Sequence, residues 1–181
     1  MVDLYLGQAQ DVLLGQDFLT WLWCMSERTG GAFRTTKGEN FQCVLEQRVV
    51  VQGGQGDSLE TATVSGAMSE LKEARLGLAT GKKVTRALVR LAVDEEEWSV
   101  TLKAEDFSLN SLKTPKIEAG REEGDDPDAT YLEKFYLLER AMELLDSLYL
   151  QFLQARLAAD WPETVKVVRQ WIAAAGSEQR A

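Results

Sequence analysis

The fold is decided by the stretch Gly15-Gln-Asp-Phe-Leu-Thr-Trp-Leu-Trp-Cys-Met-Ser-Glu27, which holds two of the five tryptophans of the chain. Asp17 is placed to cap a helix that begins at Phe18, because an aspartate carboxylate accepts hydrogen bonds from the free amides of a first helical turn. From Phe18 to Met25 the apolar side chains lie all round the helix, which favours burial between two layers. We therefore expect this helix inside the core.

Composition limits the broad class of the protein. A length of 181 residues fits one domain with a sizeable core. No apolar run approaches the roughly 20 residues that span a bilayer. The start, Met1-Val-Asp-Leu-Tyr5, lacks the basic and apolar parts of a signal peptide. We expect a cytoplasmic protein with no membrane partner, located at the nucleoid if it binds DNA.

The residues that usually carry catalysis are few. Histidine is absent, which removes Ser-His and Cys-His catalysis, His-ligated zinc and the commonest general base. Cys24 lies in the apolar helix and Cys43 in an apparent strand, so two buried thiols are the simpler interpretation. A disulfide or a reactive thiol is the alternative. The sequence indicates no catalytic residue, no metal site and no cofactor, so we expect a protein that is not an enzyme.

Glycines and alternation divide the first two thirds of the chain. Thr29-Gly30-Gly31 ends the first helix, since glycine adopts the left-handed conformation at little cost. Residues 41–52 and 59–64 are typical of two strands joined by a glycine-rich turn, and a helix follows to about Thr80. The next strand, Lys83–Val93, has one wholly apolar parity and a second that mixes apolar residues with arginines. An acidic turn, a partner strand at 98–103 and a shorter extended piece at 107–117 complete this part.

The C-terminal third is predicted to be helical. Residues 118–129 form an acidic loop that we expect to be mobile before a helical segment at 130–176. Asp128 or Thr130 caps a helix of about 45 Å, at roughly 1.5 Å per residue, and Trp161-Pro162 starts another. The order α-ββ-α-ββ-αα predicts one α+β domain over residues 1–181, in which antiparallel hairpins form a sheet packed against helices.

The long helix carries a heptad seam, whose members step alternately by four and three residues. These are Tyr131, Phe135, Leu138, Met142, Leu145, Tyr149 and Phe152. A second apolar row, from Leu137 to Leu148, lies beside it. We expect one row to pack on the sheet and the seam to bind another helix or a partner, either a second copy of the chain or a different protein.

Two motifs favour ordinary structure over chemistry. Gly77-Leu-Ala-Thr-Gly81-Lys82-Lys83 is similar to a phosphate-binding loop, but it is one residue short and ends a helix instead of beginning one. A glycine C-cap with basic neighbours explains it more simply. The acidic groups at 94–97 and 125–128 lack the alternating oxygens of a calcium loop, so solvated carboxylates are the simpler interpretation.

Charge leaves one local candidate for a binding site. The net charge of −9 argues against a surface that attracts nucleic acid everywhere. Arg86 and Arg90, however, share a strand parity about 13 Å apart, at roughly 3.3 Å per residue, a spacing that can follow a phosphate backbone. The candidate cations are Lys82, Lys83, Arg86 and Arg90, with Lys103, Lys113 and Lys116 downstream. The alternative is ordinary surface cations balanced by Glu95, Glu96, Glu97 and Glu105.

Several segments together carry a family resemblance: the Phe-Leu-Thr-Trp-Leu-Trp helix within Gly15–Glu27 and, within Ala79–Lys116, the runs Gly-Lys-Lys-Val-Thr-Arg-Ala-Leu, Trp-Ser-Val-Thr-Leu and Ser-Leu-Asn-Ser-Leu-Lys-Thr-Pro-Lys. With these segments the chain resembles the C-terminal half of the recombination-associated protein RdgC family. The order of elements fits as well. The resemblance implies a non-enzymatic, nucleoid-associated protein that binds double-stranded DNA with little sequence preference, dimerises into a ring around the duplex and restrains RecA loading.

If the resemblance holds, DNA contacts belong to Lys82, Lys83, Arg86 and Arg90, with Lys113 and Lys116 secondary. The alternative is a protein-interaction module that keeps the fold without binding DNA and docks its partner on the long helix at 131–152. Both remain hypotheses at this point.

Overall fold

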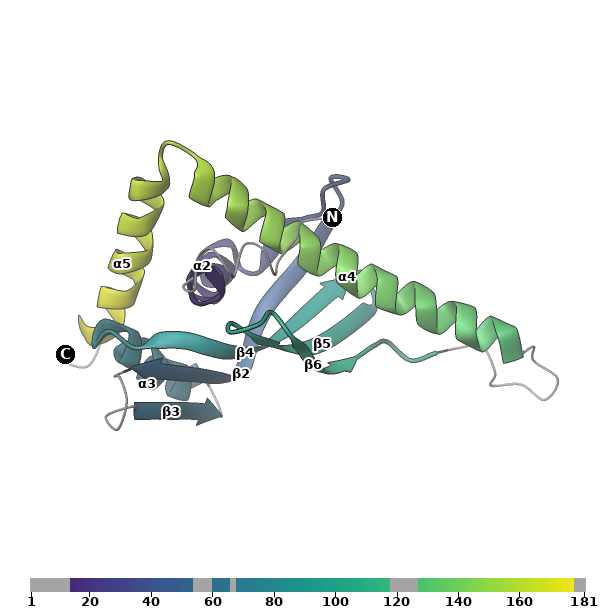
Figure 1. The fold of residues 1–181 in the computed structure, drawn as a ribbon, viewed down its shortest axis with the longest axis horizontal. Helices are drawn as coiled ribbons and strands as arrows, with labels where there is room; N and C mark the ends of the chain where they lie inside the picture. The colour runs from purple at the N-terminus through teal and green to yellow at the C-terminus, as the bar shows by residue number, and fades with distance from the viewer. Residues whose placement is uncertain (1–13, 54–59, 66–67, 118–126, 178–181) are drawn as a thin grey trace.

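The computed structural model describes residues 14–53, 60–65, 68–117 and 127–177. They form four helices and six strands (Figure 1). The elements are α2 (Leu14–Thr29), β1 (Ala32–Arg34), β2 (Asn40–Gly53), β3 (Glu60–Ser65), α3 (Met68–Ala79), β4 (Lys83–Val93), β5 (Glu96–Lys103), β6 (Leu109–Lys113), α4 (Pro127–Leu157) and α5 (Trp161–Ser177). The predicted α+β order is confirmed, with β1 as an additional short strand.

The strands form one antiparallel sheet in the order β1-β2-β4-β5-β6. The long strand β2 pairs with β4 along one edge. Its other edge pairs first with β1 and then with β3, which lies off the main path. The predicted hairpin of β2 and β3 is therefore present, although its turn at 54–59 lies outside the described residues.

The helices α2, α3 and α4 pack on the same face of this sheet, and α5 packs against these three helices. The apolar parities of β4 and β5 meet there, and Val89, Leu91, Trp98 and Val100 are fully buried. α3 approaches β2 through Gly77, next to the Val51 side chain. None of the described helices covers the opposite face of the sheet, where residues are half-buried or exposed.

The helix α2 is the centre of the core, as its all-round apolar sequence predicts. Phe18, Leu22 and Trp23 are at most 5% exposed. Gly15 allows α2 to approach β5 closely, because a Cβ there would overlap the carbonyl group of Ala104. The predicted cap at Asp17 is wrong. The chain is already helical from Leu14, and the Asp17 carboxylate instead accepts a hydrogen bond from Arg156 at 2.6 Å.

Glycines end α2 and α3 as the sequence predicts. Gly30 and Gly31 follow α2 with φ of 62° and 83°, and Gly81 follows α3 with φ of 91°. The Lys82 amide donates to the carbonyl of Gly77 at 3.0 Å, which completes the C-cap. This geometry bears out the helix-capping interpretation of the Gly77–Lys83 motif.

The long helix α4 begins three residues earlier than predicted, at Pro127, since proline suits a first helical turn. The last residues of the predicted acidic loop, 127–129, are therefore helical, and its residues 118–126 lie outside the described part. Figure 1 shows α4 crossing the sheet diagonally, with its N-terminal end reaching beyond the strands. None of the described helices combines the length and apolarity that crossing a bilayer requires.

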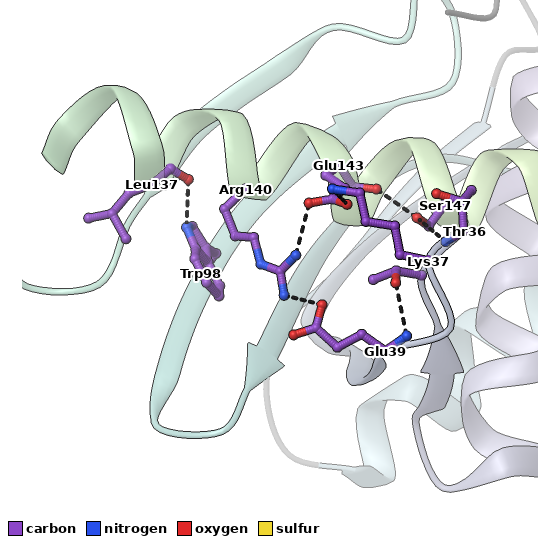
Figure 2. Close-up of polar contacts among 9 residues, drawn as sticks. Thr36, Lys37, Glu39, Trp98, Leu137, Arg140, Glu143 and Ser147 are labelled. Carbon is purple, nitrogen blue, oxygen red and sulfur yellow. Dashed lines mark hydrogen bonds and ion pairs between the residues drawn. The ribbon is translucent and has the colours of Figure 1, made fainter. Parts of the chain in front are cut away.

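Neutral hydrogen bonds attach α4 to the sheet and to the β1–β2 turn, and Figure 2 shows two of them. The buried Trp98 of β5 donates its indole N–H to the carbonyl oxygen of Leu137 at 3.0 Å. The amide of Thr36, in the β1–β2 turn, donates to the hydroxyl of Ser147 at 3.2 Å. Because Ser147 is 1% exposed, its hydroxyl gives the turn amide a partner that water does not reach.

An ionic cluster holds the same turn against α4. Glu143 accepts from Arg140 at 2.8 Å and lies 2.8 Å from the Lys37 ammonium, and Arg140 also binds Glu39. The hydrogen bond that Lys37 donates to Glu143 lowers the pKa of the Glu143 carboxyl most, and the hydrogen bond from Arg140 is the second cause. The carboxylate is thus the favoured form where α4 meets the turn.

Candidate nucleic-acid interface

The candidate interface is the face of the sheet that no described helix covers. Along β4, Val84 and Ala87 are buried against the helices, which directs Lys83 and Arg86 to the opposite face. Val84 and Ala87 are three residues apart and still face the same side, because a β-bulge lies between them. The ladder with β2 passes from Val51↔Val84 to Val50↔Arg86 and leaves Thr85 unpaired. Simple alternation predicted Val84 on the basic face, and the bulge corrects this.

Arg86 has a second cation as its cross-strand neighbour. The register of β4 and β5 places Arg86 directly opposite Lys103, on the uncovered face. Within the described part of the chain, neither forms an ion pair. Lys103 contributes only in part to the lowered pKa of the exposed Asp106 carboxyl, whose main cause is hydrogen bonding from Ser108. Like charges directly opposite each other in a sheet are destabilising.

Arg90 and Lys82 behave as ordinary paired surface cations. The Arg90 guanidinium lies 3.2 Å from Glu46 and 3.0 Å from Glu97. Lys82 binds Glu60 at 2.9 Å. Of the four expected carboxylate partners only Glu97 forms an ion pair with either cation, and Glu46 and Glu60 supply the others.

The remaining predicted cations divide between the sheet and its edge. Lys113 of β6 is opposite Ser99, which alternates with the buried Trp98 and Val100, so Lys113 belongs to the uncovered face. Lys116 is exposed but follows the end of β6, outside the ladder. Sequence reasoning ranked Lys103 low because only the strand register reveals its position opposite Arg86.

The sheet face therefore presents Lys83, Arg86, Lys103 and Lys113 without ion pairs among the described residues, beside the neutralised Arg90. Beside Arg90 the face also carries the carboxylates of Glu46 and Glu97, and its other side chains are polar or aliphatic. They include Gln42, Val44, Leu88, Ser99, Thr101 and Asn110. Such a surface can donate hydrogen bonds to anionic oxygens. Among the described residues of this face there is no aromatic side chain on which a base could stack.

The heptad seam of α4 is divided into two parts. Leu145, Tyr149 and Phe152 are 8%, 4% and 0% exposed and pack in the core, so predicting them as a partner interface was wrong. The Phe18 ring of α2 contacts Tyr149 and Phe152, with ring centroids 5.2 and 5.5 Å apart. The heptad spacing is the same throughout and cannot show where the core ends.

The first part of the seam is exposed. Tyr131 and Phe135 are 60% and 68% exposed, and Leu138 and Met142 are 42% and 44% exposed. Leu132 and Tyr136 beside them are exposed as well. Large apolar side chains gathered in this way on one helix end mark an interaction surface.

The structure does not favour a reactive thiol or a metal site among the described residues. Cys24 and Cys43 are free and buried, which confirms the buried-thiol interpretation. Burial raises the pKa of the Cys24 thiol to about 11 and raises that of Cys43 as well, so the thiol form dominates at neutral pH. Within the ranges that the structure describes, no three Cys, Asp or Glu side chains converge to hold a metal ion.

Comparison with known proteins identifies no relative. No family model matches the chain, and neither a curated protein nor a solved structure is significantly similar to it. The candidate interface and the exposed part of the seam therefore have to be interpreted from their own geometry.

Proposed function

We propose that this protein binds double-stranded DNA through its phosphates, without sequence preference and without catalysis, on the uncovered face of the sheet. The observation that carries the proposal is the opposition of Arg86 and Lys103. Two cations in this arrangement repel each other in the free protein. A phosphate oxygen between them would relieve that repulsion and accept charge-assisted hydrogen bonds from both.

The composition of the face favours duplex DNA as the ligand. Its unpaired cations come from three neighbouring strands, which lie about 4.8 Å apart in a sheet. Phosphate contacts position a duplex and do not read its bases, so little sequence preference follows. The face is less suited to single-stranded nucleic acid, because proteins bind such ligands by stacking the bases on aromatic side chains. The RdgC-like segments of the sequence agree with this choice.

The test is a salt titration of binding to short labelled duplexes of two unrelated sequences, followed by fluorescence anisotropy. The logarithm of the affinity should fall linearly with the logarithm of the salt concentration, with a slope of roughly −3 if about three phosphates are contacted. Both sequences should bind alike. The double variant Arg86→Glu/Lys103→Glu should lose binding to both.

A matched control separates a local effect from total charge. Lys134→Glu/Lys166→Glu changes the net charge by the same amount on α4 and α5, away from the sheet face, and should retain most of the affinity. Equal losses in the two double variants would contradict the assignment of the site. Absence of duplex binding even at about 50 mM salt, where screening is still modest, would refute the function.

The exposed part of the α4 seam supports a second candidate, self-association. Six large apolar side chains, each 42–70% exposed, line residues 131–142. Together they offer on the order of 600 Å² of apolar surface, close to the ~800 Å² that each partner buries in a standard interface. The heptad spacing suits a helix as the occupant, and a second copy supplies an identical helix through a two-fold contact. We therefore assign this surface to a homodimer.

Light scattering after size exclusion tests the dimer. The wild type should elute with twice the chain mass at sub-millimolar concentration, and Phe135→Glu should elute as a monomer, because a buried carboxylate without a partner is costly. Gln154→Glu, exposed on the same helix but outside the seam, should remain dimeric. A monomeric wild type would remove this candidate and would leave duplex binding unaffected.

A further inference from the structure

A cleft on the helix side of the sheet lies where α2, the α3–β4 turn and α5 meet, and Lys83 borders both this cleft and the candidate interface. It has a volume of about 350 Å³. Three groups of residues line it: Asp17, Thr20 and Trp21 from α2; Leu78, Gly81, Lys82 and Lys83 around the turn; and Trp161, Val165, Val168, Arg169 and Ile172 from α5. None of these residues belongs to the exposed seam of α4.

The wall that α5 contributes is apolar and incompletely covered. Val165, Val168 and Ile172 are spaced by three and four residues, as on one helix face, and all three are only half-buried. The half-buried indole of Trp161, which packs against Phe152 and lies near the Arg156 guanidinium, extends this wall, and the buried Trp21 borders it. An amphipathic face that borders a cleft in this way leaves room for an apolar body of limited size.

The charges around the cleft are predominantly positive, in contrast to the chain as a whole. Its one carboxylate, Asp17, is engaged by Arg156 at 2.6 Å. Lys82 is held only by Glu60, whose side chain is 74% exposed, and such surface pairs contribute little. Within the described part of the chain, Arg169 has no ion-pair partner. A ligand that combines an apolar body with negative charge complements this arrangement.

We propose that the cleft binds a nucleotide, with the base against the tryptophan and valine wall and the phosphate at Arg169 and Lys82. Indole faces beside arginine or lysine are the combination with which proteins hold single nucleotides without reading their sequence. The volume is near the lower end of small-molecule sites, which suits one base better than a long acyl chain. The nucleotide can be free or can be an unpaired residue at a DNA end. This inference does not rest on duplex binding at the sheet face.

Calorimetric titration with AMP, adenosine and inorganic phosphate tests the cleft. AMP should bind more tightly than either fragment, because only AMP uses both the apolar wall and the cations. Arg169→Ala should weaken AMP binding roughly tenfold, the effect of losing one charge-assisted hydrogen bond. Lys166→Ala, which removes a cation from the same helix outside the cleft, should leave the affinity unchanged. Trp161→Phe keeps an aromatic ring and should weaken binding less than Trp161→Leu.

Comparing the binding of two DNA ligands distinguishes a free nucleotide from an unpaired residue at a DNA end. If an unpaired end is bound, a duplex with a short single-stranded tail should bind more tightly than the blunt duplex, and Arg169→Ala should abolish that difference while blunt-duplex affinity stays the same. Binding of AMP without any preference for tails would assign the cleft to free nucleotides. AMP binding no tighter than that of phosphate, or equal in the wild type and Arg169→Ala, would overturn the proposal.

Discussion

At the scale of single residues, Lys103 is in an electrostatically unfavourable position on the sheet. It lies opposite Arg86 although the protein has nine more acidic than basic groups from which a partner could have been supplied. Arg90, four residues further along β4, has two carboxylates within 3.2 Å. The two arginines of one strand therefore differ, because Arg90 is paired with carboxylates whereas Arg86 faces a second cation, and a ligand anion at Arg86 is what the proposed function adds.

Lys103→Gln separates the stability of this position from its binding role. The substitution removes the like-charge contact, so the free energy of unfolding should rise by about 0.2–1 kcal/mol, while duplex affinity should fall. Urea denaturation and the anisotropy titration measure the two effects. Lys113→Gln is the matched control, because Lys113 is opposite Ser99 and has no cation to repel. It should weaken binding without any gain in stability, and a similar gain in both variants would contradict the argument.

At the scale of elements, α4 is one helix with two environments. Its second half supplies buried side chains to the core, and its first half extends past the sheet with exposed aromatic residues. The boundary is marked by contacts with β5 and the β1–β2 turn, through Leu137, Glu143 and Ser147. These contacts fix the angle of the helix across the sheet, and so determine which seam residues remain available.

Lowering the pH should weaken the contact between α4 and the β1–β2 turn, because the Glu143 carboxylate becomes protonated. Its lowered pKa means that the carboxylate stabilises the fold above the ordinary glutamate value of about 4.3, and that this contribution is lost as the pH falls through the folded-state pKa. Glu143→Gln should therefore be less stable than the wild type at pH 7, and the difference should shrink below about pH 4. Thermal unfolding at several pH values measures it.

An exposed ion pair provides the control for that experiment. Glu163→Gln removes a surface partner of Lys166 within α5 and should change stability little at either pH. A stability difference between wild type and Glu143→Gln that is the same at pH 7 and pH 3 would show that the charge of Glu143 does not contribute.

Local sequence was sufficient for the order of elements, because caps, glycine stops and alternation act within a few residues of each other. Local sequence was insufficient where a neighbouring strand or helix determines which way a side chain faces or whether it is buried. The bulge at Thr85 turns Val84 into the core, and only pairing with β2 reveals it. In the same way, Tyr149 and Phe135 have equal places in the heptad, and only the packing of Phe18 of α2 against Tyr149 buries one of them.

At the scale of the whole molecule, the helices that the structure describes are all on one side of the sheet, and this leaves the candidate interface uncovered by them. A net charge of −9 repels DNA at long range, so the basic face can act only where the duplex comes within about 10 Å at moderate salt. Binding of this kind is expected to be weaker and more dependent on salt than that of a protein with a uniformly basic surface.

Because Leu137 is the first buried residue of α4, the helix is not expected to open as a single cooperative unit. The exposed turns before Leu137 should open at a lower free energy than the turns after Ser147, which are packed in the core. An isolated helix as short as the first half is marginal in water. Any molecule that covers those turns must therefore spend part of its binding free energy on ordering them, and the affinity of the seam depends on how much helix the free protein already holds.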